Sequence, residues 1–171
     1  MINVAAFIQL KAFARQDGAL LVLFWVASFL SYMYSPHAPW GQLLMLCTPF
    51  VVGWRMIKFR NYALDGHMSY RRAFAYSCYV FFYASIIFAL VQYVYFRFID
   101  TGQMNSMILD SIQTVAPYYR QQGMSDADIQ ATTDMMTGMS PLYKAFVFMM
   151  VNFLQGIAAS VVLAFVGMKR K

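Results

Sequence analysis

The sequence predicts an all-α integral membrane protein with four transmembrane helices and with both chain ends in the cytoplasm. Of the 171 residues, 61% are hydrophobic and 12% are charged, whereas charged residues make up about 25% of soluble domains. Four long apolar stretches are separated by polar segments, and Lys and Arg gather in alternate connections. We therefore interpret residues 1–171 as a single membrane domain.

Four apolar stretches provide the predicted spans. A helix needs about 20 mainly apolar residues to cross a hydrocarbon core of about 30 Å. The stretches cover residues 19–34, 40–57, 73–98 and 142–168. Pro49 lies inside the second stretch and removes one backbone hydrogen bond, so we expect a kink there.

The segment before the first span is amphipathic. Its apolar residues recur at near-helical spacing, with polar residues between them: Val4, Phe7, Ile8, Leu10 and Phe13. This pattern predicts a short N-terminal helix lying on the inner leaflet. Asp17-Gly18 would then form a turn before the first span. The alternative is one helix that continues into the span without a break.

The segment of about residues 100–140, between the third and fourth spans, is too polar to cross a membrane. Its apolar residues again recur at three and four positions: Met104, Met107, Ile108, Ile112 and Val115. Pro117 and Gly123 are expected to interrupt this helix, and Ser125 to begin a second one. We predict an extracytoplasmic helical hairpin that packs on the bundle, with a protein-partner surface as the alternative.

The distribution of Lys and Arg predicts the orientation. Ten basic residues fall on one side of the predicted spans and three on the other. Lys11 and Arg15 precede the first span, five basic residues connect the second to the third, and Lys169-Arg170-Lys171 follow the fourth. The positive-inside rule then places both chain ends in the cytoplasm, for a multi-pass protein of a bacterial inner (cytoplasmic) membrane.

The basic inner connection is the first candidate contact surface. It comprises Arg55, Lys58, Arg60, Arg71 and Arg72. These cations are expected to meet anionic headgroups of the inner leaflet, or a protein partner. Because the positive-inside pattern accounts for the net charge of +6, we expect no nucleic-acid binding.

A row of small and amide residues on the fourth span predicts helix packing. The row comprises Asn152, Gln155, Gly156, Ser160 and Ala164. Small residues let two helices approach, and amides form hydrogen bonds between helices. The contact could lie within the chain or between copies. A transporter would instead need Gln42, Gln92, Asn152 and Gln155 to face inward together.

The sequence gives little support for catalysis. It contains no nucleotide-binding loop and no hydrolase or metalloprotease motif. His37 and His67 fall on opposite sides of the predicted membrane, and Cys47 and Cys78 lie in apolar runs. The loop from Asp65 to Arg72 is the nearest approach to a catalytic cluster, and a solvated, lipid-facing loop explains it. We therefore predict a protein without enzymatic activity, metal or cofactor.

Several segments resemble a known family. They are Ala14–Leu21 with Phe24–Phe29, Thr48–Phe50, Trp54-Arg55, Phe59-Arg60, Arg71–Ser77, Phe81–Ser85 and Gln92–Phe96. Together they resemble the bacterial membrane family called domain of unknown function 4199, over essentially the whole chain. The resemblance implies a small four-span inner-membrane protein of uncharacterised activity, from a family whose members often accompany a polyprenol-phosphate-type glycosyltransferase in the genome. It transfers no catalytic residue to this chain.

The leading functional hypothesis is therefore a non-catalytic accessory or scaffold protein of envelope biogenesis. Its expected partners are anionic lipids of the inner leaflet and either a membrane-associated protein or further copies of itself. The alternative is a small transporter or lipid-handling membrane protein.

Overall fold

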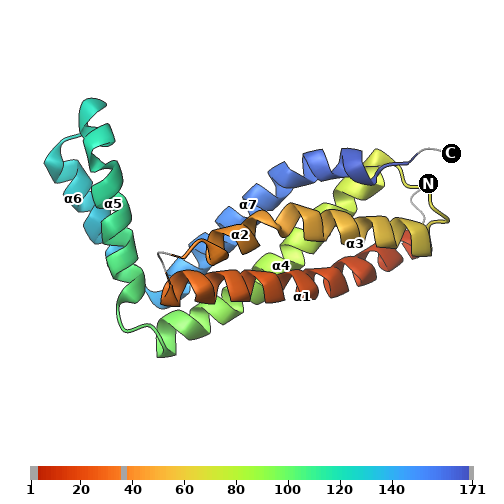
Figure 1. The fold of residues 1–171 in the computed structure, drawn as a ribbon, viewed down its shortest axis with the longest axis horizontal. Coiled ribbons are helices and arrows are strands. Elements are labelled where there is room, and N and C mark those ends of the chain that lie inside the picture. Colours follow the sequence, from red (N-terminus) through yellow and green to blue (C-terminus); the bar gives the residue numbers. More distant parts are fainter. Residues whose placement is uncertain (1–3, 36–37, 170–171) are drawn as a thin grey trace. The chain divides into compact units, whose positions relative to one another are not determined.

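The computed structural model describes residues 4–35 and 38–169, and the described chain is all-helical (Figure 1). Its helices are α1 (Val4–Tyr34), α2 (Trp40–Leu46), α3 (Thr48–Ala63), α4 (Tyr70–Phe98), α5 (Gln103–Gln121), α6 (Asp126–Thr137) and α7 (Pro141–Gly167). Three residues with sequence predictions, His37, Arg170 and Lys171, lie outside the described part.

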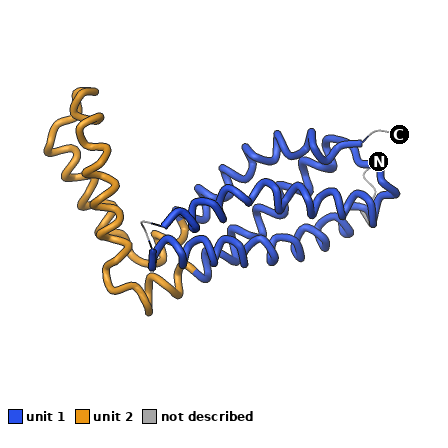
Figure 2. The backbone as a smooth tube through the Cα atoms, viewed as in Figure 1, with its two compact units in different colours: residues 1–91, 147–171 blue, residues 92–146 orange. Residues whose placement is uncertain are grey.

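The chain divides into two compact units (Figure 2). Unit 1 comprises residues 1–91 and 147–171, and unit 2 comprises residues 92–146. α4 and α7 each contribute residues to both units.

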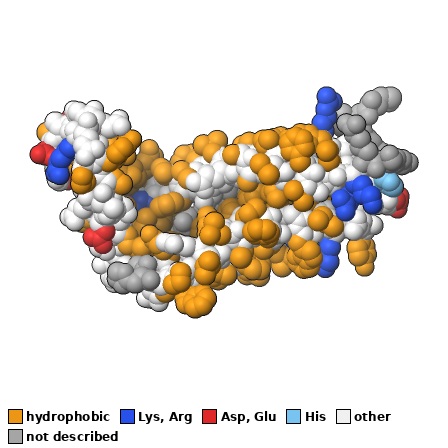
Figure 3. All heavy atoms as spheres, turned by 45° about the horizontal axis from the view of Figure 1, so that its top comes forward, with side chains coloured by type: hydrophobic (Ala, Val, Ile, Leu, Met, Phe, Trp, Pro, Cys, Tyr) orange, Lys and Arg blue, Asp and Glu red, His pale blue; other side chains and the backbone are white. Residues whose placement is uncertain are grey.

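Among the described residues, three helices are long and apolar enough to cross a membrane. They cover Ala6–Tyr34, Tyr70–Phe98 and Pro141–Gly167, with 29, 29 and 27 residues. At 1.5 Å per residue each is about 40 Å long, which exceeds the hydrocarbon thickness of about 30 Å. Hydrophobic side chains are spread over the face of unit 1 that Figure 3 shows. The protein is therefore a multi-pass membrane protein of the all-α class.

α1 is one continuous helix, so the prediction of a separate N-terminal amphipathic helix is wrong. The expected turn at Asp17-Gly18 is instead a helix crossing. A Cβ atom on Gly18 would lie 2.9 Å from the Val80 carbonyl oxygen and 3.0 Å from Tyr83 Cβ. Glycine thus lets α1 approach the backbone of α4, and the preceding residue, Asp17, becomes buried.

The stretch predicted as the second span forms two helices, α2 and α3, and α3 continues to Ala63. α2 ends at Leu46, and Pro49, which lacks a backbone N–H, lies in the first turn of α3. Both helices run antiparallel along α1. Trp25 Nε1 donates to Thr48 Oγ1 at 3.1 Å, and Ser28 Oγ donates to the Gly41 carbonyl oxygen at 2.6 Å.

Four helix ends meet at one end of unit 1. Arg72 donates to the Ala6 carbonyl oxygen at 3.4 Å, which joins the start of α4 to the start of α1. Arg60 donates to the Gly167 carbonyl oxygen at 3.2 Å, which joins the end of α3 to the end of α7. The chain segments α1, α2–α3, α4 and α7 therefore alternate in direction. The start of α1 and the end of α7 therefore lie at the same end of unit 1 (Figure 1).

Aromatic side chains fill the core of unit 1. The rings of Phe59 and Tyr76 stack with centroids 4.8 Å apart, and Phe13 contacts Phe59 at 5.1 Å. On α7, a Cβ atom at Gly156 would lie 2.4 Å from Cγ of Phe81. Close packing inside the chain therefore accounts for the glycine in the small-residue row.

Unit 2 contains the predicted helical hairpin, formed by α5 and α6. Ser125 caps α6 as expected, because its Oγ accepts the Asp128 backbone N–H at 3.2 Å and Asp128 Oδ2 accepts the Ser125 N–H at 3.3 Å. Gly123 takes the left-handed conformation, with φ 89°, in the turn between the helices. Pro117 does not interrupt the first helix, since α5 continues through it to Gln121.

Candidate functional site

A buried carboxylate lies at the centre of the candidate site. Asp17, on α1, is 2% exposed. Arg55, on α3, forms an ion pair with Oδ1 through both Nε and Nη2. Tyr76, on α4, donates its hydroxyl hydrogen to Oδ2. Three helices thus converge on one charged group.

The local fold explains why Asp17 can stay charged in this position. Removing a carboxylate from water is costly unless a cation and hydrogen-bond donors replace the water. Arg55 supplies the cation and Tyr76 a second donor, so that both carboxylate oxygens have partners. Gly18 brings α1 close enough to α4 for this contact. The arrangement neutralises Asp17 and fixes the orientation of the Arg55 guanidinium.

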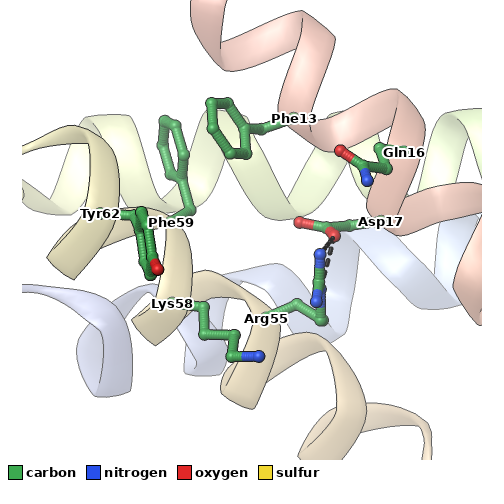
Figure 4. A pocket seen from close by; sticks show the side chains of 7 residues that line it. All are labelled: Phe13, Gln16, Asp17, Arg55, Lys58, Phe59 and Tyr62. Carbon is green, nitrogen blue, oxygen red and sulfur yellow. Dashed lines mark hydrogen bonds and ion pairs between the residues drawn. The ribbon is translucent and has the colours of Figure 1, made fainter.

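A cavity of about 270 Å³ opens beside this ion pair, between α1 and α3 (Figure 4). It is lined by Phe13, Gln16, Asp17, Arg55, Lys58, Phe59 and Tyr62. In Figure 4, Arg55 points toward Asp17, while the rings of Phe13 and Phe59 lie together away from the ion pair. The cavity therefore has both a charged wall and an aromatic wall.

A second hollow, of about 500 Å³, adjoins the cavity and shares Phe13 and Gln16 with it. Its other lining residues are Ala12, Arg15 and Ala19. The two hollows together carry the cations Arg15, Arg55 and Lys58 against one anion, Asp17. This region is therefore cationic and lies beside a largely apolar helix surface. Such a surface is complementary to an anion that carries an apolar substituent.

The five basic residues predicted to form a contact surface have different surroundings. Arg55 and Lys58 line the cavity, and Lys58 Nζ also lies 4.5 Å from the centre of the Trp54 ring. Arg60 and Arg72 bind the backbone carbonyl groups at helix ends described above. Arg71 is exposed and lines neither hollow. Only two of the five thus meet at one site.

The five residues predicted to pack α7 divide into two groups. Gly156, Ser160 and Ala164 are buried, and Ser160 Oγ donates to the Gly156 carbonyl oxygen at 2.7 Å. Asn152 is half-buried, whereas Gln155 is exposed. Gln42, on α2, is also exposed. Of the four residues named for a transporter path, Gln92 is buried, Asn152 is half-buried, and Gln42 and Gln155 are exposed.

Sequence reasoning missed Asp17 and Tyr76. Asp17-Gly18 has the local signature of a turn, and Tyr76 belongs to a run of aromatic residues on α4. A signal for Asp17 was present, because an ionisable residue within an otherwise membrane-compatible helix usually has a dedicated partner. The partner, Arg55, is 38 residues away, and only the tertiary fold identifies it.

The loop from Asp65 to Arg72, the nearest approach to a catalytic cluster in the sequence, joins α3 to α4 and ends in the first turn of α4. The Nδ1 atom of His67 lies 2.8 Å from the carbonyl oxygen of Asp65, within its own turn. Across the described residues, no three His, Cys or Asp side chains cluster in a way that could hold a metal ion. The cavity beside the Asp17–Arg55 ion pair is therefore the candidate binding site in the described part of unit 1.

Comparison with known proteins identifies a family. A family model described as "Protein of unknown function (DUF4199)" matches residues 16–169, a range that contains Asp17, Arg55 and Tyr76. Neither a curated protein nor a solved structure gives a significant match to the chain.

Proposed function

The chain belongs to the DUF4199 family of proteins of unknown function, and we propose that it is a non-catalytic accessory protein that binds an anionic lipid headgroup. The proposed binding site is the cavity lined by Arg55 and Lys58, and the proposed setting is the inner leaflet of a bacterial inner membrane. The protein would cross that membrane four times, with both ends in the cytoplasm.

The observation that carries the proposal is the pairing of two cations with an aromatic wall in one cavity. Arg55 uses Nε and Nη2 for Asp17, and its Nη1 is left for another acceptor. Guanidinium groups held in this way bind phosphate or carboxylate oxygens well. A volume of about 270 Å³ is close to the lower limit of small-molecule sites, about 300 Å³. It suits a headgroup, while the tail of the lipid would remain outside.

The direction of the helices supports the four-span arrangement. α2, Cys47 and α3 together cover residues 40–63, and this segment is about 36 Å long at 1.5 Å per residue. It runs antiparallel to α1 along most of that length. Lys58, Arg60, Arg71 and Arg72 lie near the end where α1 and α4 begin, as the positive-inside rule requires of a cytoplasmic end.

Binding fits this site better than catalysis. A general base needs a carboxylate that is free to accept a proton from its substrate. Both oxygens of Asp17 are engaged by Arg55 and Tyr76, so that its role is to orient Arg55. We propose that the protein presents its bound lipid to, or anchors, a membrane enzyme of envelope biogenesis. A glycosyltransferase acting on polyprenyl phosphate is the partner class that the resemblance implies.

Lipid binding can be tested with the purified protein in nanodiscs. Phosphatidylglycerol or polyprenyl phosphate would be titrated into a phosphatidylcholine background, and bound lipid would be counted by native mass spectrometry. Lys58→Gln should lower the affinity for the anionic lipid about tenfold, because it removes a cation that lines the cavity. Arg71→Gln removes the same charge from the same side of the protein but outside the cavity, and it serves as the matched control.

The Lys58→Gln and Arg71→Gln variants distinguish a specific headgroup site from nonspecific electrostatic attraction to anionic lipids. Each basic residue near an anionic surface contributes about 1 kcal/mol to nonspecific binding, so equal losses in both variants would contradict a headgroup site. A preference for polyprenyl phosphate over phosphatidylglycerol would identify the lipid class.

The accessory role has a separate test, in which the tagged protein is extracted from its own membranes under mild conditions. The absence of any stoichiometric enzyme in repeated preparations would contradict it.

A further inference from the structure

An amide side chain lies exposed at the middle of α7. Gln155 follows Pro141 by 14 residues and precedes Gly167 by 12, which places it about 18 Å or more from either end of the helix. No described residue forms a hydrogen bond with its carboxamide. The side chain is too short to reach the membrane surface, and an unpaired amide is costly in hydrocarbon. The described part of unit 1 therefore does not supply the polar partner that Gln155 needs in hydrocarbon.

Gln155 belongs to a regular row of exposed residues. The row comprises Val151, Gln155, Ala158, Val162 and Phe165, which are separated alternately by four and three positions. This is the spacing of the contact seam in a left-handed helix pair, and a polar residue within such a seam fixes its register. Of the three membrane-compatible helices, α7 is the least buried. In its most apolar stretch of 18 residues, 22% are buried, compared with 39% in the corresponding stretches of α1 and α4.

The face of α7 that packs inside unit 1 is a different one. Gly156, Ser160 and Ala164 are buried there, and the glycine contacts Phe81 of α4. The exposed row is thus a second surface of α7, and at one end of it the ring of Phe165 contacts the ring of Tyr70 on α4, with centroids 4.8 Å apart.

We propose that this row binds the same row of a second copy of the chain, with the two Gln155 side chains hydrogen-bonded to each other. Two copies inserted in the same direction are related by an axis along the membrane normal, so that each residue of a parallel helix pair faces its own counterpart. A carboxamide both donates and accepts, and is therefore complementary to itself.

The rest of the row fits this occupant. None of its five residues is charged, so no like charges meet when each residue faces its counterpart. Ala158 follows Gln155 on the same face, and its small side chain lets the two helices come close enough for the amides to meet. None of the five residues lines the basic cavity, so the inference does not depend on the proposed lipid site.

Cysteine cross-linking in native membrane vesicles tests the contact. In a Cys47→Ser, Cys78→Ser background, Ala158→Cys should form a disulfide-linked dimer under mild oxidation. Facing seam positions bring the two Cα atoms within the range of about 4.4–6.8 Å that a disulfide requires. Met150 is also exposed on α7 but does not belong to the row. The Met150→Cys variant should therefore remain monomeric. A cross-link at Met150→Cys but not at Ala158→Cys would overturn the proposal, as would a product containing a different protein.

A second measurement addresses the amide itself. Gln155→Leu should weaken self-association about three- to tenfold, the effect of losing hydrogen bonds between membrane helices. Association would be followed by energy transfer between labelled copies in vesicles. Gln42→Leu, which changes another exposed glutamine on α2, is the matched control and should leave association unchanged. Equal association of both variants and the unmodified protein would overturn the proposed contact.

Discussion

Asp17 on α1 and Arg55 on α3 are 38 positions apart and form an ion pair in which the carboxylate is almost completely buried. Gly18 and Tyr76 complete the arrangement, the first by letting α4 approach and the second by occupying the remaining carboxylate oxygen. A residue pair that looks like a turn in the sequence is thus the point at which three helices are joined.

The ion pair should behave as a coupled unit. Asp17→Asn leaves the Arg55 charge unpaired, and Arg55→Gln leaves a buried carboxylate without its cation. Each single change should lower the free energy of unfolding by about 3–5 kcal/mol. The double variant should lose much less than the sum, because it leaves neither charge alone. Unfolding in mixed micelles would measure all three. Additive losses would show that the two side chains are not coupled.

The close approach at Gly18 should tolerate no larger residue. In Gly18→Ala the new methyl group would lie 2.9 Å from the Val80 carbonyl oxygen and 3.0 Å from Tyr83 Cβ, and such overpacking costs about 1–3 kcal/mol. Gly53→Ala is the matched control in α3, where the nearest atom outside its own helix would be 3.6 Å away. Alanine favours a helix there by up to about 1 kcal/mol. If Gly18→Ala were as stable as Gly53→Ala, the helix crossing would be wrong.

The start of α6 should depend on pH. Hydrogen bonds from the hydroxyl and the backbone N–H of Ser125 hold the pKa of Asp128 below its ordinary range. A lowered pKa means that the cap stabilises the helix fully above the ordinary aspartate value of about 3.9. That contribution is lost as the pH falls through the lowered pKa.

NMR of the backbone amides of Asp128 and Ile129 would follow this transition during acidification. The amide signals should move toward their positions in the Ser125→Ala variant only at a pH below about 3.9. A transition of Asp128 at or above that value in the unmodified protein would contradict the capping arrangement.

Local sequence patterns predicted those parts of the fold that depend on neighbouring residues. Ser125 and Gly123 mark the hairpin because capping and a left-handed turn are local properties. The local sequence does not decide whether α1 is continuous, because Asp17-Gly18 favours a turn. Packing of Gly18 against α4 stabilises the helical conformation at this point. Pro117 was likewise expected to end a helix that in fact continues through it.

The candidate site was predicted in part. Arg55 and Lys58 were identified from the positive-inside pattern, but that pattern treats all cations of a connection alike. It did not separate these two from Arg60 and Arg72, which bind carbonyl groups at helix ends. The difference depends on contacts between residues far apart in the chain, such as Arg60 with Gly167.

Photo-cross-linking from Gln16 is the most direct test of the proposed headgroup site. A photoreactive amino acid would replace Gln16, which lines both hollows. In a second variant it would replace Gln9, which is exposed two helical turns earlier on α1 and lines neither. After irradiation of native membranes, mass spectrometry would identify the adducts. The proposal predicts a lipid with a net negative headgroup attached at position 16 and much less of it at position 9. Equal labelling at the two positions, or adducts at position 16 with zwitterionic lipids alone, would contradict it.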